Sequence, residues 1–252
     1  MDSAELPWEL PDSVWESMVG PFMSTPASLE RAAVEVNGIV LLVGVAPGAR
    51  VLDIGCGMGR HALEFARRGF GVTGVDKTVS FLDQARQQAR EEGLAIEFVQ
   101  QDMRAFRQPD SFDLALNLNT SFGYFEDPAD DLLTLRNIHD SLLPGGSLVL
   151  QTIGTEVLAR IFQERDWAEI EGDFFLQERS PAEDWSRMDL RWIKITSNQR
   201  EEWSFTHRLF SATDLTELMR EVGFRSVATY GDLAGGPYDE TALKLVVVAQ
   251  KD

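Results

Sequence analysis

The stretch VLDIGCGMGRHALEFARRG, residues 51–69, decides the fold. An apolar run typical of a short strand, RVLDI at 50–54, leads into a turn with glycine at every second position, and a helical pattern follows at once. Glycines let a ligand come close to the backbone, and a glycine-rich turn between a strand and a helix is an arrangement that binds nucleotides. The stretch therefore predicts the first strand–turn–helix unit of a nucleotide-binding α/β sheet.

Strand and helix patterns alternate along the chain after this stretch. Strands are predicted at 71–76, 95–102, 112–119 and 147–153, with helices at 79–93 and 130–146 between them. Consecutive strands that are separated by helices are joined by right-handed crossovers. These segments therefore predict a parallel sheet that is covered by helices.

The pattern changes in the second half of the chain. Runs at 173–184 and 189–211 are typical of strands, with a hairpin turn near 197–199. They predict an antiparallel β insertion at about 171–210, within a domain that spans 47–252.

The end of the chain returns to the alternating pattern. A helix is predicted at 212–224, with Ser211 or Thr213 as its N-cap, and strands at 226–233 and 242–251 follow it. These two strands predict a final β-hairpin.

Composition limits the function. The 252 residues suit one α/β domain with an insertion, and the formal net charge of −18 disfavours nucleic acid as a partner. The single cysteine, Cys56, excludes an internal disulfide and a cysteine-cluster metal site. No apolar run reaches the ~20 residues that span a bilayer, and the first residues do not resemble a signal peptide. We therefore expect a cytoplasmic protein that binds no membrane.

The spacing around the glycines indicates which nucleotide binds. Asp76 ends the second predicted strand, where an acidic side chain accepts hydrogen bonds from ribose hydroxyls. The dinucleotide fingerprint G-x-G-x-x-G has a third glycine where this chain has Arg60. Asp53 also places a carboxylate beside the turn, which suits a ligand with a cationic part rather than a pyrophosphate. S-adenosylmethionine has a ribose, an ammonium and a sulfonium, so it fits these residues better than NAD does.

Five segments in chain order resemble the motifs of class I S-adenosylmethionine-dependent methyltransferases, over about residues 48–153. They are VLDIGCGMGR, GVTGVD, QQDMRAF, FDLALNLNTSFGYF and LLPGGSLVL. The longer pattern is similar to a group of bacterial small-molecule methyltransferases. The resemblance implies a Rossmann-like α/β fold with a seven-stranded sheet, mostly parallel with an antiparallel last strand.

The resemblance also implies the residues that bind S-adenosylmethionine. Asp53, Gly55 and Gly57 would flank its methionine part, and Asp76, with Lys77 beside it, would hold the ribose. Asp102 and Met103 would contact the adenine, and Asn117 and Leu118 would lie beside the transferred methyl group. Arg60 has two interpretations, a contact to the methionine carboxylate or an ion pair with acidic residues of the protein.

The acceptor side is predicted from aromatic and ionisable residues. Phe122 and Tyr124 follow the fourth strand, and Tyr124 is the preferred wall of the acceptor pocket. His207 is a candidate general base at the end of the insertion, since imidazole titrates near neutrality. Tyr238, in the last loop, is a third catalytic candidate. For each of these residues a structural role is the alternative.

The N-terminal segment, 1–46, is predicted to form a helical lid over the cleft. Its large apolar residues are Trp8, Trp15, Phe22 and Met23, of which Trp15 and Phe22 are candidates for the substrate pocket. The β insertion has two interpretations, as a wall of the acceptor pocket or as a homodimer surface.

Together these features predict an enzyme that transfers a methyl group from S-adenosylmethionine to an N or O atom of a small molecule by in-line displacement, leaving S-adenosylhomocysteine. No metal site is expected, because the histidines are scattered. The alternatives are a protein or RNA methyltransferase and an NAD-dependent oxidoreductase.

Overall fold

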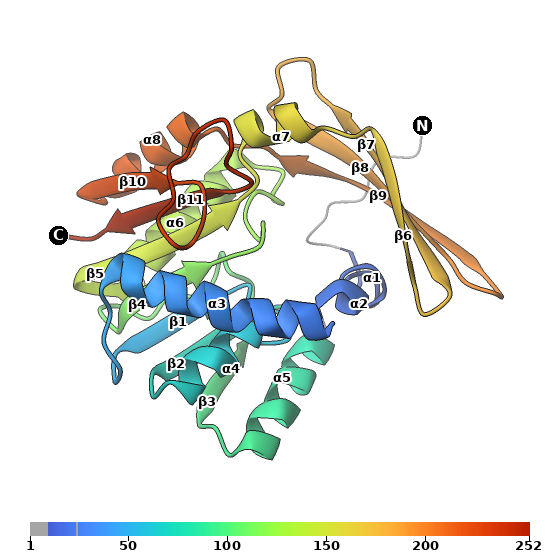
Figure 1. The fold of residues 1–252 in the computed structure, drawn as a ribbon. Coiled ribbons are helices and arrows are strands. Elements are labelled where there is room, and N and C mark those ends of the chain that lie inside the picture. Colours follow the sequence, from blue (N-terminus) through green and yellow to red (C-terminus); the bar gives the residue numbers. More distant parts are fainter. Residues whose placement is uncertain (1–9, 24) are drawn as a thin grey trace.

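A seven-stranded sheet forms the centre of the molecule, and a separate four-stranded sheet projects beside it (Figure 1). The computed structural model describes residues 10–23 and 25–252, so Trp8 lies outside the described residues. The order of strands in the large sheet is β10-β11-β5-β4-β1-β2-β3. These strands are β1 (Arg50–Ile54), β2 (Gly71–Asp76), β3 (Ile96–Gln100), β4 (Phe112–Asn117), β5 (Leu142–Thr152), β10 (Ser226–Tyr230) and β11 (Leu245–Gln250).

The pairing of the strands confirms the predicted fold class. β1 pairs in parallel with β2 and β4, and further parallel pairs join β2 to β3 and β4 to β5. β11, the last strand, runs antiparallel to both of its neighbours, β5 and β10. The strand order reverses between β1 and β4, and ligands of such sheets bind at the carboxyl ends of the strands near this reversal.

Helices cover both faces of the large sheet. Val36 and Ile39 of α3 and Phe65 of α4 pack on one face, and Leu135 of α6 and Leu215 of α8 pack on the other. These helices and their neighbours are α3 (Pro26–Val43), α4 (Arg60–Arg67), α5 (Val79–Glu92), α6 (Pro128–Ser141), α7 (Thr155–Ile161) and α8 (Ala212–Val222). None of the described helices combines the length and the apolar character that a membrane crossing requires.

The four-stranded sheet is antiparallel throughout, in the order β6-β7-β8-β9. Its strands are β6 (Arg165–Ile170), β7 (Asp173–Pro181), β8 (Arg187–Ile195) and β9 (Arg200–Arg208). Trp167 and Phe174 are exposed on this sheet and their rings are in contact. A homodimer through this sheet stays a prediction.

Two short helices lie between the two sheets, α1 (Asp12–Met18) and α2 (Gly20–Met23) (Figure 1). Val14 and Met18 of α1 are buried against Phe175, Trp192 and Phe205 of the small sheet. The backbone N–H of Val79, at the start of α5, donates to the Asp12 carboxylate (3.0 Å). α1 therefore joins the small sheet to the helix that follows β2.

Three segments differ from the sequence prediction, namely residues 142–146, β6 and α7, a helix that was not predicted. Residues 142–146, expected at the end of a helix, belong to β5, where Leu142 pairs with Phe112 before a register shift. The helix ends at Ser141 because the next residue, Leu142, already has an extended backbone (φ −76°, ψ 144°). β6 was not predicted, because its charged and exposed residues, RDWAEI, hide the alternation of an edge strand.

The N-cap of α8 provides a test of local stability. Ser211 Oγ accepts from the Asp214 N–H (3.1 Å), and the Asp214 carboxylate accepts from the Ser211 N–H (2.8 Å), which is a capping box. We expect Ser211→Ala to lower the free energy of unfolding by about 1 kcal/mol. Urea unfolding measures the change, and Thr213→Ala, at the alternative position, should change it by less than about 0.5 kcal/mol. Equal losses in both variants would contradict the assignment of Ser211.

Candidate functional site

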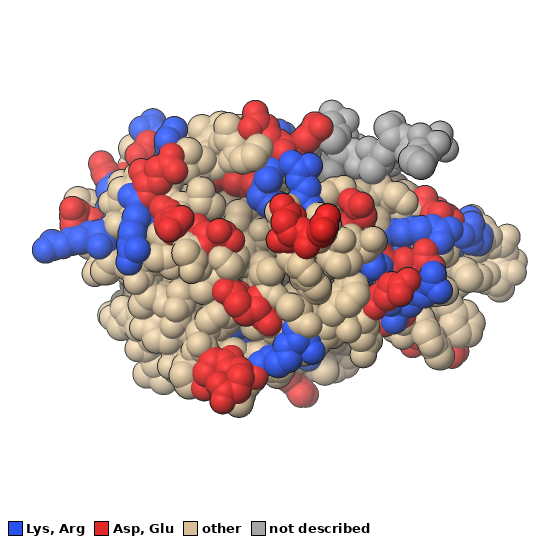
Figure 2. Space-filling view, turned by 90° about the horizontal axis from the view of Figure 1, so that it is seen from above, with Lys and Arg blue, Asp and Glu red and all other residues tan. Residues whose placement is uncertain are grey.

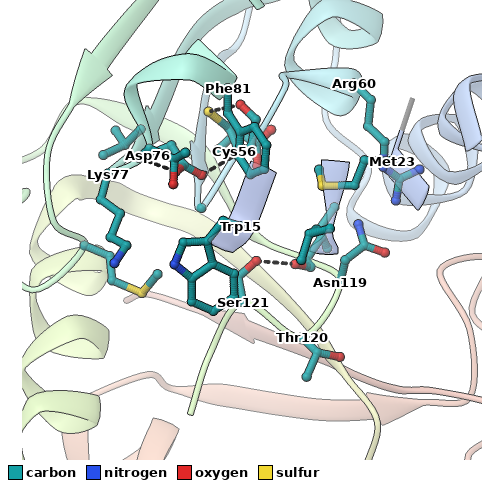
Figure 3. A pocket seen from close by; sticks show the side chains of 18 of the residues that line it. Trp15, Met23, Cys56, Arg60, Asp76, Lys77, Phe81, Asn119, Thr120 and Ser121 are labelled. Atoms are coloured by element: carbon teal, nitrogen blue, oxygen red, sulfur yellow. Dashed lines mark hydrogen bonds between the residues drawn. The ribbon is translucent and has the colours of Figure 1, made fainter. Parts of the chain in front are cut away.

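A cavity of about 420 Å³ lies at the carboxyl ends of β1, β2 and β4 and extends to α1, α2 and β8. Most of the residues predicted for cofactor and substrate line it, and Figure 3 shows part of the lining. The predicted residues that the structure brings together here are Trp15, Phe22, Asp53, Gly55, Gly57, Arg60, Asp76, Lys77, Asp102, Met103, Leu118 and Tyr124.

The glycine turn after β1 has positive φ angles and close neighbours. Gly55 has φ +73°, and a Cβ there would lie 2.9 Å from the Ser121 Cβ. Gly57 has φ +54°, and a Cβ there would lie 2.6 Å from the Met23 Cε. Larger residues are therefore excluded by the backbone conformation and by the protein's own side chains, in addition to any ligand.

The backbone N–H groups of this turn already have partners in the protein. The N–H groups of Gly55 and Cys56 donate to the Val75 carbonyl at 2.8 and 3.1 Å. The N–H of Gly57 donates to Asp76 Oδ2 at 2.7 Å. A pyrophosphate needs such N–H groups as donors, so this turn is a poor site for a dinucleotide.

Asp53 is a buried carboxylate at the end of β1, with 2% of its surface exposed. Burial raises its pKa to about 7, although the Arg60 charge and the Ala62 backbone N–H lower it. Its Oδ2 has no hydrogen-bond partner within the part of the chain that the structure describes. This oxygen can therefore accept from a cationic donor of a ligand.

Asp76 ends β2 and holds the glycine turn. Its Oδ2 accepts from Gly57, and its Oδ1 accepts from the Thr78 N–H at 2.9 Å. Burial raises the pKa of Asp76, while these two N–H groups oppose the shift. Each oxygen keeps a second lone pair, so the carboxylate can still accept from ribose hydroxyls.

Asp102 lies in the loop after β3 and is held by Arg104, two residues later in the chain. Arg104 Nη2 lies 2.6 Å from Asp102 Oδ2, and Arg104 Nη1 lies 2.9 Å from Asp130. Burial raises the pKa of Asp102, but the Arg104 hydrogen bonds outweigh burial and the pKa is lowered. Asp102 is thus an ionised, oriented acceptor, and the neighbouring Met103 gives an apolar wall.

Arg60 pairs with an acidic residue of the protein, as one of its two interpretations proposed. Its Nη1 lies 2.9 Å from Glu35 Oε2 of α3, and His61 Nε2 lies 2.8 Å from the same oxygen. Burial lowers the pKa of His61 despite the Glu35 carboxylate. The cluster fixes α3 against the start of α4. A contact of Arg60 to a ligand carboxylate stays a prediction.

Aromatic rings form the other end of the cavity. Trp15 of α1 meets Tyr124 edge to face at 5.6 Å between ring centroids, and it meets Trp192 of β8 at 5.9 Å. Phe22 of α2 lines the same end. Burial raises the pKa of Tyr124 to about 12, so this phenol is neutral at physiological pH. The end is a mainly apolar space with a neutral hydroxyl in its wall.

Four residues predicted for the site, namely Asn117, Phe122, His207 and Tyr238, lie outside the lining of this cavity. Asn117 is buried and its Nδ2 donates to the Ile54 carbonyl (3.0 Å), which ties β4 to β1. Phe122 is a core residue that packs on Phe210 at 5.2 Å. The side chains of Asn117 and Phe122 are both buried in the interior of the protein. Leu118, the residue after Asn117, lines the cavity instead.

His207 and Tyr238 make hydrogen bonds within the protein. His207 Nε2 donates to the Phe122 carbonyl (2.9 Å), and its ring lies 4.5 Å from that of Tyr124. Burial lowers the pKa of His207 to about 4, so it is neutral. Tyr238 donates its hydroxyl to Glu156 Oε2 at 2.8 Å. His207 therefore supports Tyr124 from behind, and Tyr238 anchors the last loop to α7.

The sequence analysis missed several residues of the lining. Trp192 comes from the inserted sheet, and the sequence gives no sign that its face of β8 turns toward the large sheet. Arg31 of α3 and Phe81 of α5 also line the cavity. Arg31 lies four residues before Glu35, so both are on the same face of α3. This spacing is the one signal that could have placed Arg31 near Arg60.

The cavity suits S-adenosylmethionine. Its ammonium would supply the donor that Asp53 Oδ2 lacks, and its ribose hydroxyls would reach the lone pairs of Asp76. Figure 3 shows Asp76 and Lys77 on one side of the cavity and Arg60 and Met23 on the other, with Trp15 between them. No group of three His, Cys, Asp or Glu side chains among the described residues could hold a metal ion.

Comparison with known sequences agrees with this geometry. A family model described as a methyltransferase domain matches residues 51–146. A ubiquinone biosynthesis O-methyltransferase of Xanthomonas campestris is 30% identical over 187 residues, which cover 68% of this chain and 75% of the relative. A putative methyltransferase of Geobacillus is 34% identical over 115 residues, so this chain spans 47% of that relative's length.

Solved structures share the fold. An S-adenosylmethionine-dependent methyltransferase from Clostridium acetobutylicum has a TM-score of 0.77 at 13% identity, over 95% of this chain and 96% of that one. CalS10, an amino pentose methyltransferase from Micromonospora echinaspora with bound S-adenosylmethionine, has a TM-score of 0.65 at 24% identity, over 97% and 99% of the two chains.

The buried carboxyl of Asp53 predicts a pH-dependent stability. Its pKa is raised from 3.8 in the unfolded chain to about 7 in the folded protein. The neutral carboxyl therefore contributes its full share to the free energy of unfolding below about pH 4, and this contribution is lost as the pH rises to about 7. Relative to Asp53→Asn, the free energy of unfolding of the ligand-free native protein should fall by about 1.4 kcal/mol per pH unit in this interval and then level off. Urea unfolding at several pH values measures this difference.

The exposed Asp83 of α5 provides the control for this experiment. The curves of Asp83→Asn and of the native protein should run parallel over the same pH interval. A constant difference between Asp53→Asn and the native protein would show that Asp53 is ionised throughout.

Proposed function

Because the chain belongs to the class I S-adenosylmethionine-dependent methyltransferases, we propose that it methylates an N or O atom of a small molecule by in-line displacement. One observation carries this proposal. A single cavity has carboxylates at the glycine turn and a wall of aromatic rings facing them. The first end suits the methyl donor, and the second end has room for a flat acceptor beside it.

The residues at the glycine turn would orient the donor. When bound, S-adenosylmethionine supplies an electrophilic methyl group on a positively charged sulfur. Asp53 would hold the ammonium and Asp76 the ribose, while Asp102 and Met103 would contact the adenine. These contacts fix the direction in which the methyl group points. Holding the reacting atoms in line lowers the free-energy barrier of such a displacement.

The aromatic residues would exclude water and favour a cationic sulfur. Trp15, Tyr124 and Trp192 surround this end of the cavity, and aromatic faces attract cations. His207 fixes Tyr124 by packing against its ring, and we assign it as a positioning residue rather than a general base. The neutral Tyr124 hydroxyl remains the polar group of this wall that can bond to the acceptor.

Several features support a small acceptor over a protein or an RNA. α1 and the small sheet cover the aromatic end of the cavity, which leaves little room for a polymer. On the face shown in Figure 2, acidic and basic side chains of the described residues alternate and form no continuous basic track. The proteins similar to this chain include a ubiquinone biosynthesis O-methyltransferase and an amino pentose methyltransferase.

Binding of the donor tests the role of Asp76. We expect Asp76→Asn to weaken S-adenosylmethionine binding by about 1–3 kcal/mol, because hydrogen bonds to a charged group are lost. Isothermal titration calorimetry measures the affinity, and Asp83→Asn is the matched control with an exposed acid on α5. NAD should release no binding heat. Unchanged affinity in Asp76→Asn would remove Asp76 from the site.

Methyl uptake tests the class of acceptor. Methyl-labelled S-adenosylmethionine is incubated with the protein and a cell extract, which is then separated into small molecules, RNA and protein. We expect label in the small-molecule fraction with the native protein and little with Asp76→Asn. Label confined to RNA or protein would overturn the proposed acceptor and leave methyl transfer itself intact.

A further inference from the structure

Two buried indole nitrogens in the cavity wall lack hydrogen-bond partners. Trp15 Nε1 and Trp192 Nε1 have no hydrogen-bond partner among the described residues, and both nitrogens are buried. A buried tryptophan N–H normally finds an acceptor, and an unmet buried donor costs about 1–3 kcal/mol. Two such donors on adjacent rings of one cavity therefore indicate a partner that is supplied by a ligand.

The unpartnered groups at the two ends of the cavity are of opposite kinds. At the glycine turn, Asp53 Oδ2 is an acceptor without a donor, which suits the ammonium of S-adenosylmethionine. At the aromatic end, Trp15 and Trp192 are donors without an acceptor. The molecule bound at the aromatic end must therefore bring hydrogen-bond-accepting oxygens rather than N–H groups.

Among the described residues, no carboxylate or imidazole lines the aromatic end without a partner of its own. The titratable residues of this end are Tyr124, a phenol that burial keeps neutral, and Lys77, whose Nζ lies 5.7 Å from the centroid of the Trp15 ring. Asp102 is engaged by Arg104, and His61 by Glu35. A hydroxyl that ionises only weakly would need a base here, whereas an acidic hydroxyl loses its proton to water before it binds.

We propose that the acceptor is a flat, mainly apolar molecule with an acidic hydroxyl, such as a phenol or enol, which binds as its oxyanion to the indole N–H groups of Trp15 and Trp192. This rests on the methyl transfer proposed above and narrows it to oxygen. Both rings line the cavity, and both indole nitrogens lie below its surface, so each ring must rotate for its N–H to reach the ligand. An ammonium group brings only donors, so both indole N–H groups stay unpaired when it binds.

The chemistry of this transfer balances without a base. An O–CH₃ bond forms as the S–CH₃ bond breaks, and the electron pair of the broken bond stays on sulfur. The negative charge of the acceptor and the positive charge of the donor both disappear. The products are a methyl ether and S-adenosylhomocysteine, and the proton of the hydroxyl has already gone to water.

A pair of probes of similar size tests the charge preference. Equilibrium dialysis at mildly alkaline pH, with saturating S-adenosylhomocysteine to prevent turnover, compares 4-nitrophenol with 4-nitrobenzylamine. We expect the phenolate to bind at least about tenfold more tightly than the ammonium, because charged hydrogen bonds to the indoles are gained by one and lost by the other. Equal binding, tighter binding of the amine, or no phenol binding would overturn the proposal.

Two substitutions that keep an aromatic ring test the indole donors. Trp15→Phe and Trp192→Phe should each weaken 4-nitrophenolate binding about tenfold and leave S-adenosylhomocysteine affinity within about twofold. Trp203→Phe is the matched control, because Trp203 lies opposite Trp192 in the β8–β9 register and does not line the cavity. It should change neither affinity.

The cofactor affinity separates the two ways in which this proposal can fail. If the phenolate affinity is unchanged in both variants, the indoles do not bind the acceptor. If S-adenosylhomocysteine affinity falls in parallel, the indoles serve the cofactor instead. If the native protein binds no S-adenosylhomocysteine, it is the proposed function that fails.

Discussion

The hydrogen bond from the Gly57 N–H to Asp76 joins the ends of β1 and β2, and the site depends on it. The Gly57 N–H is thereby bonded within the protein and does not point at a ligand. The groups that face a ligand at this turn are carboxylates. At this end of the cavity the side chains that face a ligand, Asp53 and Asp76, are therefore hydrogen-bond acceptors rather than donors. A fold that often binds phosphates is in this way adapted to a nucleoside with a cationic amino acid.

α1 couples this carboxylate end to the acceptor end. Its Asp12 accepts from the N–H of Val79, close to Asp76, and its Trp15 forms the wall shared with Tyr124 and Trp192. The same short helix is buried against the small sheet through Val14 and Met18. A movement of α1 would therefore change both ends of the cavity at once, so donor and acceptor binding need not be independent.

Sequence reasoning found the residues whose place is fixed locally. Asp53 and Asp76 stand at the ends of predicted parallel strands, so the topology alone brings them together. Trp192 could not be found in this way, because its role depends on how an inserted sheet docks on α1. Asn117 and Leu118 are neighbours in the chain, yet Leu118 lines the cavity and Asn117 does not, since a strand sends adjacent side chains to opposite sides. His207 has the chemistry of a base, but burial, which no local pattern reveals, lowers its pKa to about 4 and makes it a weak base.

Different elements of the fold form the donor end and the acceptor end of the cavity, which explains how such a fold can change its acceptor. The carboxylates and glycines come from β1, β2 and their turns, whereas the aromatic wall comes from α1, α2, the loop after β4 and β8. The two sets meet across one cavity, and few side chains belong to both. Substitutions in the aromatic wall can therefore alter which molecule is bound and leave the donor site intact, provided that each buried donor of the new wall finds an acceptor on the new molecule.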